Sequence, residues 1–257
     1  MKTVISKDGT PIGYERAGTG HPLIFAAGAF NDHTTCAGLA SLLSGAYTVV
    51  NYDRRGRGVS GDTPPYAIDR EIDDLAALIE AVGGSAAIFG YSSGGMLGLQ
   101  AAVDGLPVTG LVLFEPPFTV DGHRLPADLA ARMQAAVDGG RPGDAVALFQ
   151  LEAVGLPPSV VDSIRESPMF AGLAAMAQTA VYDTLITLAF SDPTPGMRAL
   201  DVPVLALHGA QTWPQLAAAA ARIGTAVPGA LVRAVDGGAN HAIPDAATAA
   251  EIRAFLG

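Results

Sequence analysis

The stretch Phe89-Gly90-Tyr91-Ser92-Ser93-Gly94-Gly95 separates an apolar run at residues 86–89 from a helix-forming segment at residues 96–103. The apolar run predicts a buried strand, so the stretch predicts a sharp strand-to-helix turn of the form Gly-x-Ser-x-Gly. Bulky side chains two residues before or after the central serine would collide in such a turn. Glycine avoids the collision because it lacks Cβ and tolerates strained dihedral angles. The serine hydroxyl would then project from the end of a sheet, next to a helix N-terminus.

Two adjacent serines compete for the centre of this turn. Ser92 has Gly90 and Gly94 at the flanking positions, whereas Ser93 has Tyr91 on one side. Only Ser92 meets the steric requirement on both sides, so we predict that Ser92 is a nucleophile. The backbone N–H of Ser93 would then lie at the helix N-terminus, where it can donate to an oxyanion. The alternative is an ordinary loop rich in glycine and serine.

Length and composition favour one large folded domain. The chain has 257 residues, of which 49% are hydrophobic and 16% charged, so we expect a well-buried core and no disorder. The formal net charge of −10 argues against nucleic acid as a partner. The single cysteine, Cys36, excludes an intrachain disulfide and a cysteine-rich metal site. The sequence shows neither a signal-peptide core nor an apolar run of membrane length, which predicts a cytoplasmic protein without a membrane partner.

Strand and helix patterns alternate along most of the chain. A hairpin with an Asp-Gly turn is predicted near the start, at residues 4–15, and a closing helix at residues 245–256. Buried strands are predicted at residues 22–27, 47–52, 86–89, 108–114, 202–208 and 230–235. This alternation indicates an α/β fold with a mostly parallel central sheet and helices on both faces. Ligands bind at the carboxyl edge of such sheets. The strand ends expected at that edge are Gly28, Asp53, Gly90, Glu115 and Gly209.

The segment 118–196 shows helical patterns and no strand pattern. We therefore predict that residues 1–117 and 197–257 form the core and that residues 118–196 form an inserted helical lid over the carboxyl edge. The alternative is that these helices cover one face of the sheet. The lid is rich in Ala, Leu, Val and Met, which predicts a mainly apolar substrate. The residues expected to contact this substrate, each of which could instead belong to the core, are Phe30, Tyr91, Phe118, Met133, Tyr182 and Trp213.

A serine hydroxyl becomes a good nucleophile only when a base accepts its proton. His241 ends a glycine-containing loop at residues 236–241, between the last strand and the last helix. Such a loop can carry an imidazole over the sheet edge, so we predict that His241 is the base. His33 follows Gly28 and is the main alternative, with substrate contact as its other possible role. His208 ends a strand, where we expect it in packing contacts.

These pieces resemble the α/β-hydrolase superfamily over nearly the whole chain. The matching segments are Gly28 after the first buried strand, Asp53-Arg54-Arg55-Gly56-Arg57-Gly58-Val59-Ser60, the serine turn, Leu207-His208-Gly209 and His241. The resemblance implies an α/β-hydrolase fold. It also implies that the arginine-rich turn is mostly structural, with Asp53 as a ready partner for its arginines and anion binding as the alternative.

The position of the acid that orients the base departs from the usual pattern of this superfamily. In most members an aspartate follows the histidine-glycine strand end by a few residues, but Thr212 occupies that position here and cannot serve. Some members place the acid at the end of the preceding core strand, where this chain has Glu115 followed by two prolines. The resemblance therefore implies that Glu115 orients His241. The alternative for Glu115 is a salt-bridged strand end.

Within the superfamily the arrangement looks like the zearalenone-type lactonases. They share the Gly-x-Ser-Ser-Gly turn, the glutamate before a proline, the Gly-Ala-x-Thr segment and the closing histidine. The resemblance implies a serine hydrolase, without metal or organic cofactor, that cleaves an ester or lactone of an apolar small molecule. Oxyanion donors would be the N–H of Ser93 and that of Gly28 or Ala29. Two alternatives stay open: a non-hydrolytic reaction (carbon–carbon cleavage, perhydrolysis or cyclisation) and a catalytically silent binding protein.

Overall fold

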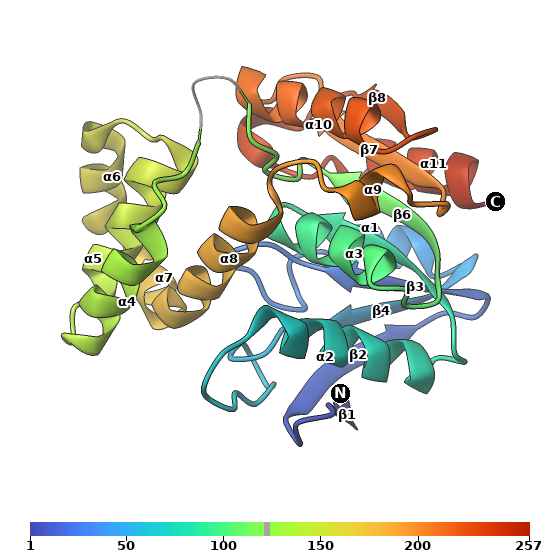
Figure 1. The fold of residues 1–257 in the computed structure, drawn as a ribbon, viewed down its shortest axis with the longest axis horizontal. Coiled ribbons are helices and arrows are strands. Elements are labelled where there is room, and N and C mark those ends of the chain that lie inside the picture. Colours follow the sequence, from blue (N-terminus) through green and yellow to red (C-terminus); the bar gives the residue numbers. More distant parts are fainter. Residues whose placement is uncertain (121–123) are drawn as a thin grey trace.

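A computed structural model describes residues 1–120 and 124–257. Its sheet has eight strands in the order β1-β2-β4-β3-β5-β6-β7-β8 (Figure 1). The strands are β1 (Lys2–Ile5), β2 (Pro11–Ala17), β3 (His21–Ala26), β4 (Tyr47–Tyr52), β5 (Ala86–Tyr91), β6 (Val108–Phe114), β7 (Val204–Gly209) and β8 (Leu231–Val235). Strand β2 pairs antiparallel with both β1 and β4, and the six strands β3 to β8 are parallel to one another. The predicted fold class is confirmed.

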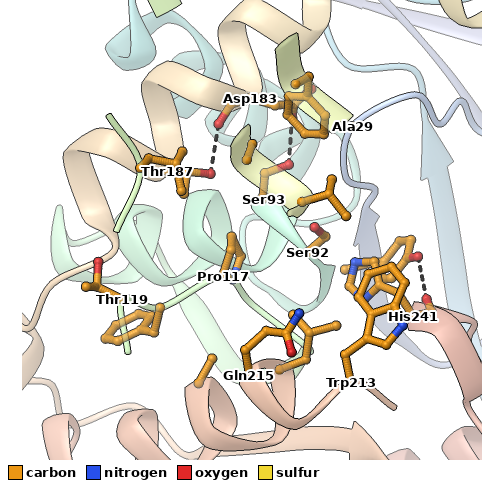
Figure 2. A pocket seen from close by; sticks show the side chains of 18 of the residues that line it. Ala29, Ser92, Ser93, Pro117, Thr119, Asp183, Thr187, Trp213, Gln215 and His241 are labelled. Carbon is orange, nitrogen blue, oxygen red and sulfur yellow. Dashed lines mark hydrogen bonds between the residues drawn. The ribbon is translucent and has the colours of Figure 1, made fainter. Parts of the chain in front are cut away.

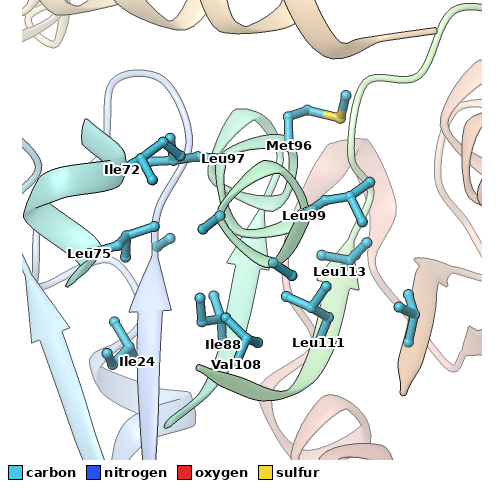
Figure 3. Packing of buried hydrophobic residues seen from close by; sticks show 14 of the residues in the cluster. Ile24, Ile72, Leu75, Ile88, Met96, Leu97, Leu99, Val108, Leu111 and Leu113 are labelled. Atoms are coloured by element: carbon cyan, nitrogen blue, oxygen red, sulfur yellow. The ribbon is translucent and has the colours of Figure 1, made fainter. Parts of the chain in front are cut away.

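Helices cover both faces of the sheet, as the alternating pattern predicted. One face carries α2 (Ile68–Ala81), α3 (Ser93–Val103) and α10 (Pro214–Ala226), and the other carries α1 (Ala37–Leu43) and α11 (Asp245–Leu256). The two-residue period of a strand sends neighbouring side chains to opposite faces. In β5, Ile88 packs toward α2 and α3, whereas Phe89 packs toward α1 and α11. Figure 3 shows Ile88 with Leu97 of α3 and Leu75 of α2. Each such burial contributes about 1.5–3 kcal/mol.

The helices between β6 and β7 form a group with its own hydrophobic cluster, which we call the helical insertion. Its members are α4 (Leu129–Asp138), α5 (Pro142–Leu148), η1 (Phe149–Val154), α6 (Pro158–Arg165), α7 (Phe170–Ala175) and α8 (Ala177–Phe190), and the short helix α9 (Pro195–Arg198) leads into β7. Figure 1 shows α4–α7 set apart from the sheet, with α8 returning to pack against α3. The helices α7 and α8 meet at Met176.

The described residues contain no helix that is both long and apolar enough to cross a membrane.

Candidate active site

The turn between β5 and α3 has the tight geometry that its glycines predicted. Ser92 has φ 55° and ψ −128°, an unusual conformation for a residue with a side chain. A Cβ on Gly90 would lie 2.4 Å from the Gly95 Cα, and one on Gly94 would lie 2.0 Å from the Ala26 carbonyl oxygen. Both positions therefore require glycine, and the turn holds Ser92 at the carboxyl end of β5.

Glu115 lies directly after β6 and is fully buried. Its Oε1 accepts a hydrogen bond from the Gly209 backbone N–H at 2.8 Å. Its Oε2 lies 2.5 Å from Nδ1 of His241. This pairing places the proton of a neutral imidazole on Nδ1 and leaves Nε2 free to accept one. The structure therefore brings Glu115 and His241 into the relation that the acid and base of a serine hydrolase require.

The loop that carries His241 is held at the sheet edge by several contacts. His241 belongs to the short helix η2 (Ala239–His241), and Gly238 just before it packs so closely on Gly209 that a Cβ on Gly209 would lie 2.4 Å from the Gly238 oxygen. The Tyr91 hydroxyl donates to the His241 carbonyl at 2.7 Å, and the two rings lie 4.8 Å apart. Contacts from β5 and β7 thus hold the loop that carries the imidazole.

Ser92 and His241 both line a cavity of about 220 Å³. Four of the predicted contact residues line it, namely Phe30, Tyr91, Phe118 and Trp213. Figure 2 shows Ser92, Trp213 and His241 at this cavity. The helical insertion contributes further lining residues that the sequence analysis missed, among them Phe149, Ala153, Asp183 and Thr187. In residues 1–120 and 124–257 there is no group of His, Cys, Asp or Glu side chains suited to hold a metal ion.

Two predicted contact residues lie elsewhere. Met133 is buried in the hydrophobic cluster of the helical insertion. Tyr182 stacks on Tyr66 with ring centroids 3.8 Å apart, and its hydroxyl donates to Asp62 at 2.7 Å. Neither belongs to the cavity lining, so the expectation that they contact substrate is corrected. Met133 lies inside the insertion, and Tyr182 lies where the insertion meets the core. The apolar periodicity of a helix predicts that such residues are buried, but it does not distinguish these positions from a pocket wall.

The arginine-rich turn is structural, but Asp53 is not the partner of its arginines. Asp53 accepts instead from His33, through the backbone N–H at 2.8 Å and Nδ1 at 2.9 Å. This contact also places His33, the alternative base, outside the cavity lining. The partners of Arg54 are Glu71 and Asp183, at 2.7 and 2.6 Å. The pairing expected from sequence is therefore wrong, because the buried acids that neutralise Arg54 come from two helices, Glu71 from α2 and Asp183 from α8.

Asp183 pairs with the buried arginines of this turn and also lines the cavity. Oδ1 accepts from Arg54 and from the Ser93 hydroxyl, each at 2.6 Å, and Oδ2 accepts from Arg57 at 2.6 Å. Burial acts to raise the pKa of Asp183, but the guanidinium groups of Arg57 and Arg54 outweigh it and hold that pKa below its usual range. Asp183 is therefore an anion at neutral pH, neutralised by two cations.

Gly28 lies against Ser92 so closely that a side chain would displace the serine. A Cβ built on Gly28 would lie 2.6 Å from the Ser92 Cβ and 3.3 Å from its Oγ. We expect Gly28→Ala to lower kcat roughly 100-fold, because a displacement of about 1 Å in a reacting group costs a factor of this size. Kinetics on a purified variant with an unchanged circular dichroism spectrum would check this. Full activity would show that Ser92 does not need its observed position.

Comparisons with known proteins identify the family of the chain. The sequence model described as the Alpha/beta hydrolase family matches residues 18–254. A solved structure of an alpha/beta hydrolase from Sphaerobacter thermophilus is 41% identical, with a TM-score of 0.92 and 100% of both chains covered. An enol-lactonase from Burkholderia xenovorans shares the fold, with a TM-score of 0.70 at 20% identity over 99% of both chains. A non-heme chloroperoxidase from Streptomyces lividans is 28% identical over 81% of each sequence. The chain therefore belongs to the α/β-hydrolase family.

Proposed function

We propose that this protein is a serine hydrolase that cleaves a carboxylic ester or lactone of a small, mainly apolar molecule. The observation that carries the proposal is the pair of Glu115 and His241, joined at 2.5 Å, at the cavity that Ser92 also lines. A strained serine beside such a pair is the arrangement that covalent acyl transfer requires. The esterase and lactonase activities named for proteins that share this fold are consistent with it.

Each group of the site has a role in this reaction. Ser92 Oγ attacks the carbonyl carbon while His241 Nε2 accepts the hydroxyl proton. The Glu115 carboxylate stabilises the imidazolium that forms. The protonated His241 then donates to the leaving alkoxide, and an acyl group remains on Ser92. A water molecule, deprotonated by His241, attacks this acyl-enzyme and restores the serine. Backbone N–H groups of Ser93 and of the loop after β3 stabilise the oxyanion in both steps.

Within the described residues, no hydrogen bond joins Ser92 to His241. Catalytic hydrogen bonds of ligand-free enzymes are commonly long and tighten when substrate binds. We therefore expect the imidazole to approach the hydroxyl in the substrate complex, with the contact to Glu115 retained.

We propose that residues 118–196 act as a lid over this cavity. Leu125, Phe149 and Val154 come from this segment and line the cavity that Ser92 also lines. Their apolar side chains would desolvate the substrate and favour an apolar acyl or alcohol group.

A panel of substrates tests the proposal. It should contain aryl esters, alkyl esters and lactones of increasing size, each assayed with the wild-type protein and with Ser92→Ala. We expect at least one class to be hydrolysed by the wild type at a rate that Ser92→Ala loses. A panel on which the two proteins do not differ would overturn the proposal.

A second candidate is perhydrolysis, in which hydrogen peroxide replaces water at the acyl-enzyme and a peracid is released. The relatives that favour it are named as a chloroperoxidase and a haloperoxidase, at 28% and 27% identity. Peracid formation from an ester and hydrogen peroxide, measured against hydrolysis of the same ester, distinguishes the two. Release of the carboxylic acid alone would exclude perhydrolysis.

A further inference from the structure

We propose that Asp183, on α8 of the helical insertion, is a positioning residue that holds both donors of the oxyanion hole. This inference rests on the proposed function, because it assigns a role within the same reaction. The insertion would then be part of the catalytic machinery as well as a wall of the cavity.

The first donor is held through the Ser93 side chain. Ser93 begins α3, and its hydroxyl donates to Asp183 Oδ1 at 2.6 Å (Figure 2). Both side chains are buried, Ser93 with 3% and Asp183 with 0% of its surface exposed. A hydrogen bond to a carboxylate is stronger than one between neutral groups. The contact therefore fixes the residue whose backbone N–H faces the developing oxyanion.

The second donor is held through the arginines. Arg57 donates to Asp183 Oδ2 at 2.6 Å and, from its other terminal nitrogen, to the Gly28 carbonyl at 2.5 Å. Arg54 likewise joins Asp183 Oδ1, at 2.6 Å, to the Ala27 carbonyl, at 3.1 Å. The loop after β3 is thus connected through two guanidinium groups to the carboxylate that also holds Ser93.

The contact between Arg57 and Gly28 decides whether Gly28 or Ala29 is the second donor, which the sequence did not decide. The Gly28 carbonyl and the Ala29 N–H belong to one planar trans peptide group and point in opposite directions. With the carbonyl held on Arg57, the N–H points away from Arg57. Ala29 lines the cavity, whereas Gly28 and Arg57 do not. The structure therefore assigns the Ala29 N–H as the second donor, and the charge on Arg57 polarises that peptide toward donation.

A matched pair of variants separates positioning from stability. Asp74 is also a buried carboxylate, 1% exposed, and binds Arg55 at 2.7 and 2.8 Å, but this pair does not reach the loop after β3 or Ser93. Asp183→Asn and Asp74→Asn each remove one negative charge from a buried carboxylate that binds arginine. We expect only Asp183→Asn to lower kcat, by roughly 10- to 100-fold, with KM changed by less than about twofold, since oxyanion donors act mainly in the transition state.

The inhibition constant of a transition-state analogue distinguishes a positioning role from a purely structural one. A trifluoromethyl ketone forms an oxyanion on addition to Ser92. Its inhibition constant should rise for Asp183→Asn in proportion to the loss of kcat/KM and stay near the wild-type value for Asp74→Asn. Ser93→Ala, which removes one contact of Asp183 and keeps every charge, should show the same proportionality with a smaller loss, and it decides the matter if Asp183→Asn does not fold.

Three outcomes would overturn the inference: equal kcat losses in the two aspartate variants, wild-type kcat in both Asp183→Asn and Ser93→Ala, or a loss confined to KM. Failure of the proposed function looks different. A wild-type protein that turns over no ester or lactone and whose Ser92 resists a fluorophosphonate would refute the serine hydrolase, and the positioning role with it.

Discussion

Ser92→Ala should lower kcat by roughly six orders of magnitude while the fold stays intact, as expected for removal of a nucleophile that acts as one unit with its base. The alanine keeps the backbone conformation but supplies no oxygen to attack the carbonyl. Steady-state hydrolysis of the best substrate, together with a thermal unfolding curve, measures the effect.

Ser93→Ala is the matched control for this change. It should lose far less activity, because the backbone N–H of residue 93 remains and only the hydroxyl contact to Asp183 is removed. The reverse result, an inactive Ser93→Ala and an active Ser92→Ala, would show that the nucleophile is the neighbouring serine.

Glu115→Gln should lower kcat by roughly three to four orders of magnitude, by analogy with amide replacements of the acid in other triads. Glutamine fits the same buried space, but it carries no charge to stabilise the imidazolium. Its amide group also cannot accept from the Gly209 N–H and from His241 Nδ1–H with both of its polar atoms. The imidazole would then favour the wrong tautomer. Kinetics and an unfolding curve, measured together, separate this loss from a loss of fold.

Two other carboxylates near the late strand ends provide controls. Asp201 and Asp236 are exposed, and their asparagine variants should keep wild-type kcat. A double variant, Glu115→Gln with Thr212→Asp, should recover part of the activity, because it places an acid a few residues after β7, the position that is commoner in the superfamily. A wild-type rate for Glu115→Gln alone would assign the acid to another residue.

The sequence predicted the sheet, its covering helices and the serine turn because these follow from local rules. The turn depends on glycines at fixed positions beside Ser92, and the structure shows the steric contacts that require them. The pairing of Glu115 with His241 required the additional comparison with a known family, since the two residues are 126 positions apart.

Other features depend on tertiary contacts that no local pattern records. The partners of Arg54 and Arg57 include Asp183, more than a hundred residues away, so the sequence suggested the adjacent Asp53 instead. One signal for Asp183 was available: it is the single charged residue in the apolar segment 169–189. Met133 and Tyr182 were expected in the cavity because helical periodicity predicts burial but not which of two buried surfaces a side chain joins.

Covalent labelling with a fluorophosphonate tests the central claim, acyl transfer through Ser92, most directly. Intact mass should show one phosphonyl group per wild-type chain, and peptide mapping should locate it on Ser92. The adduct should be absent from Ser92→Ala and form slowly in Glu115→Gln, because the base activates the hydroxyl. A wild-type chain that stays unlabelled, or an adduct on Ser93 or on a residue outside the cavity, would contradict the account.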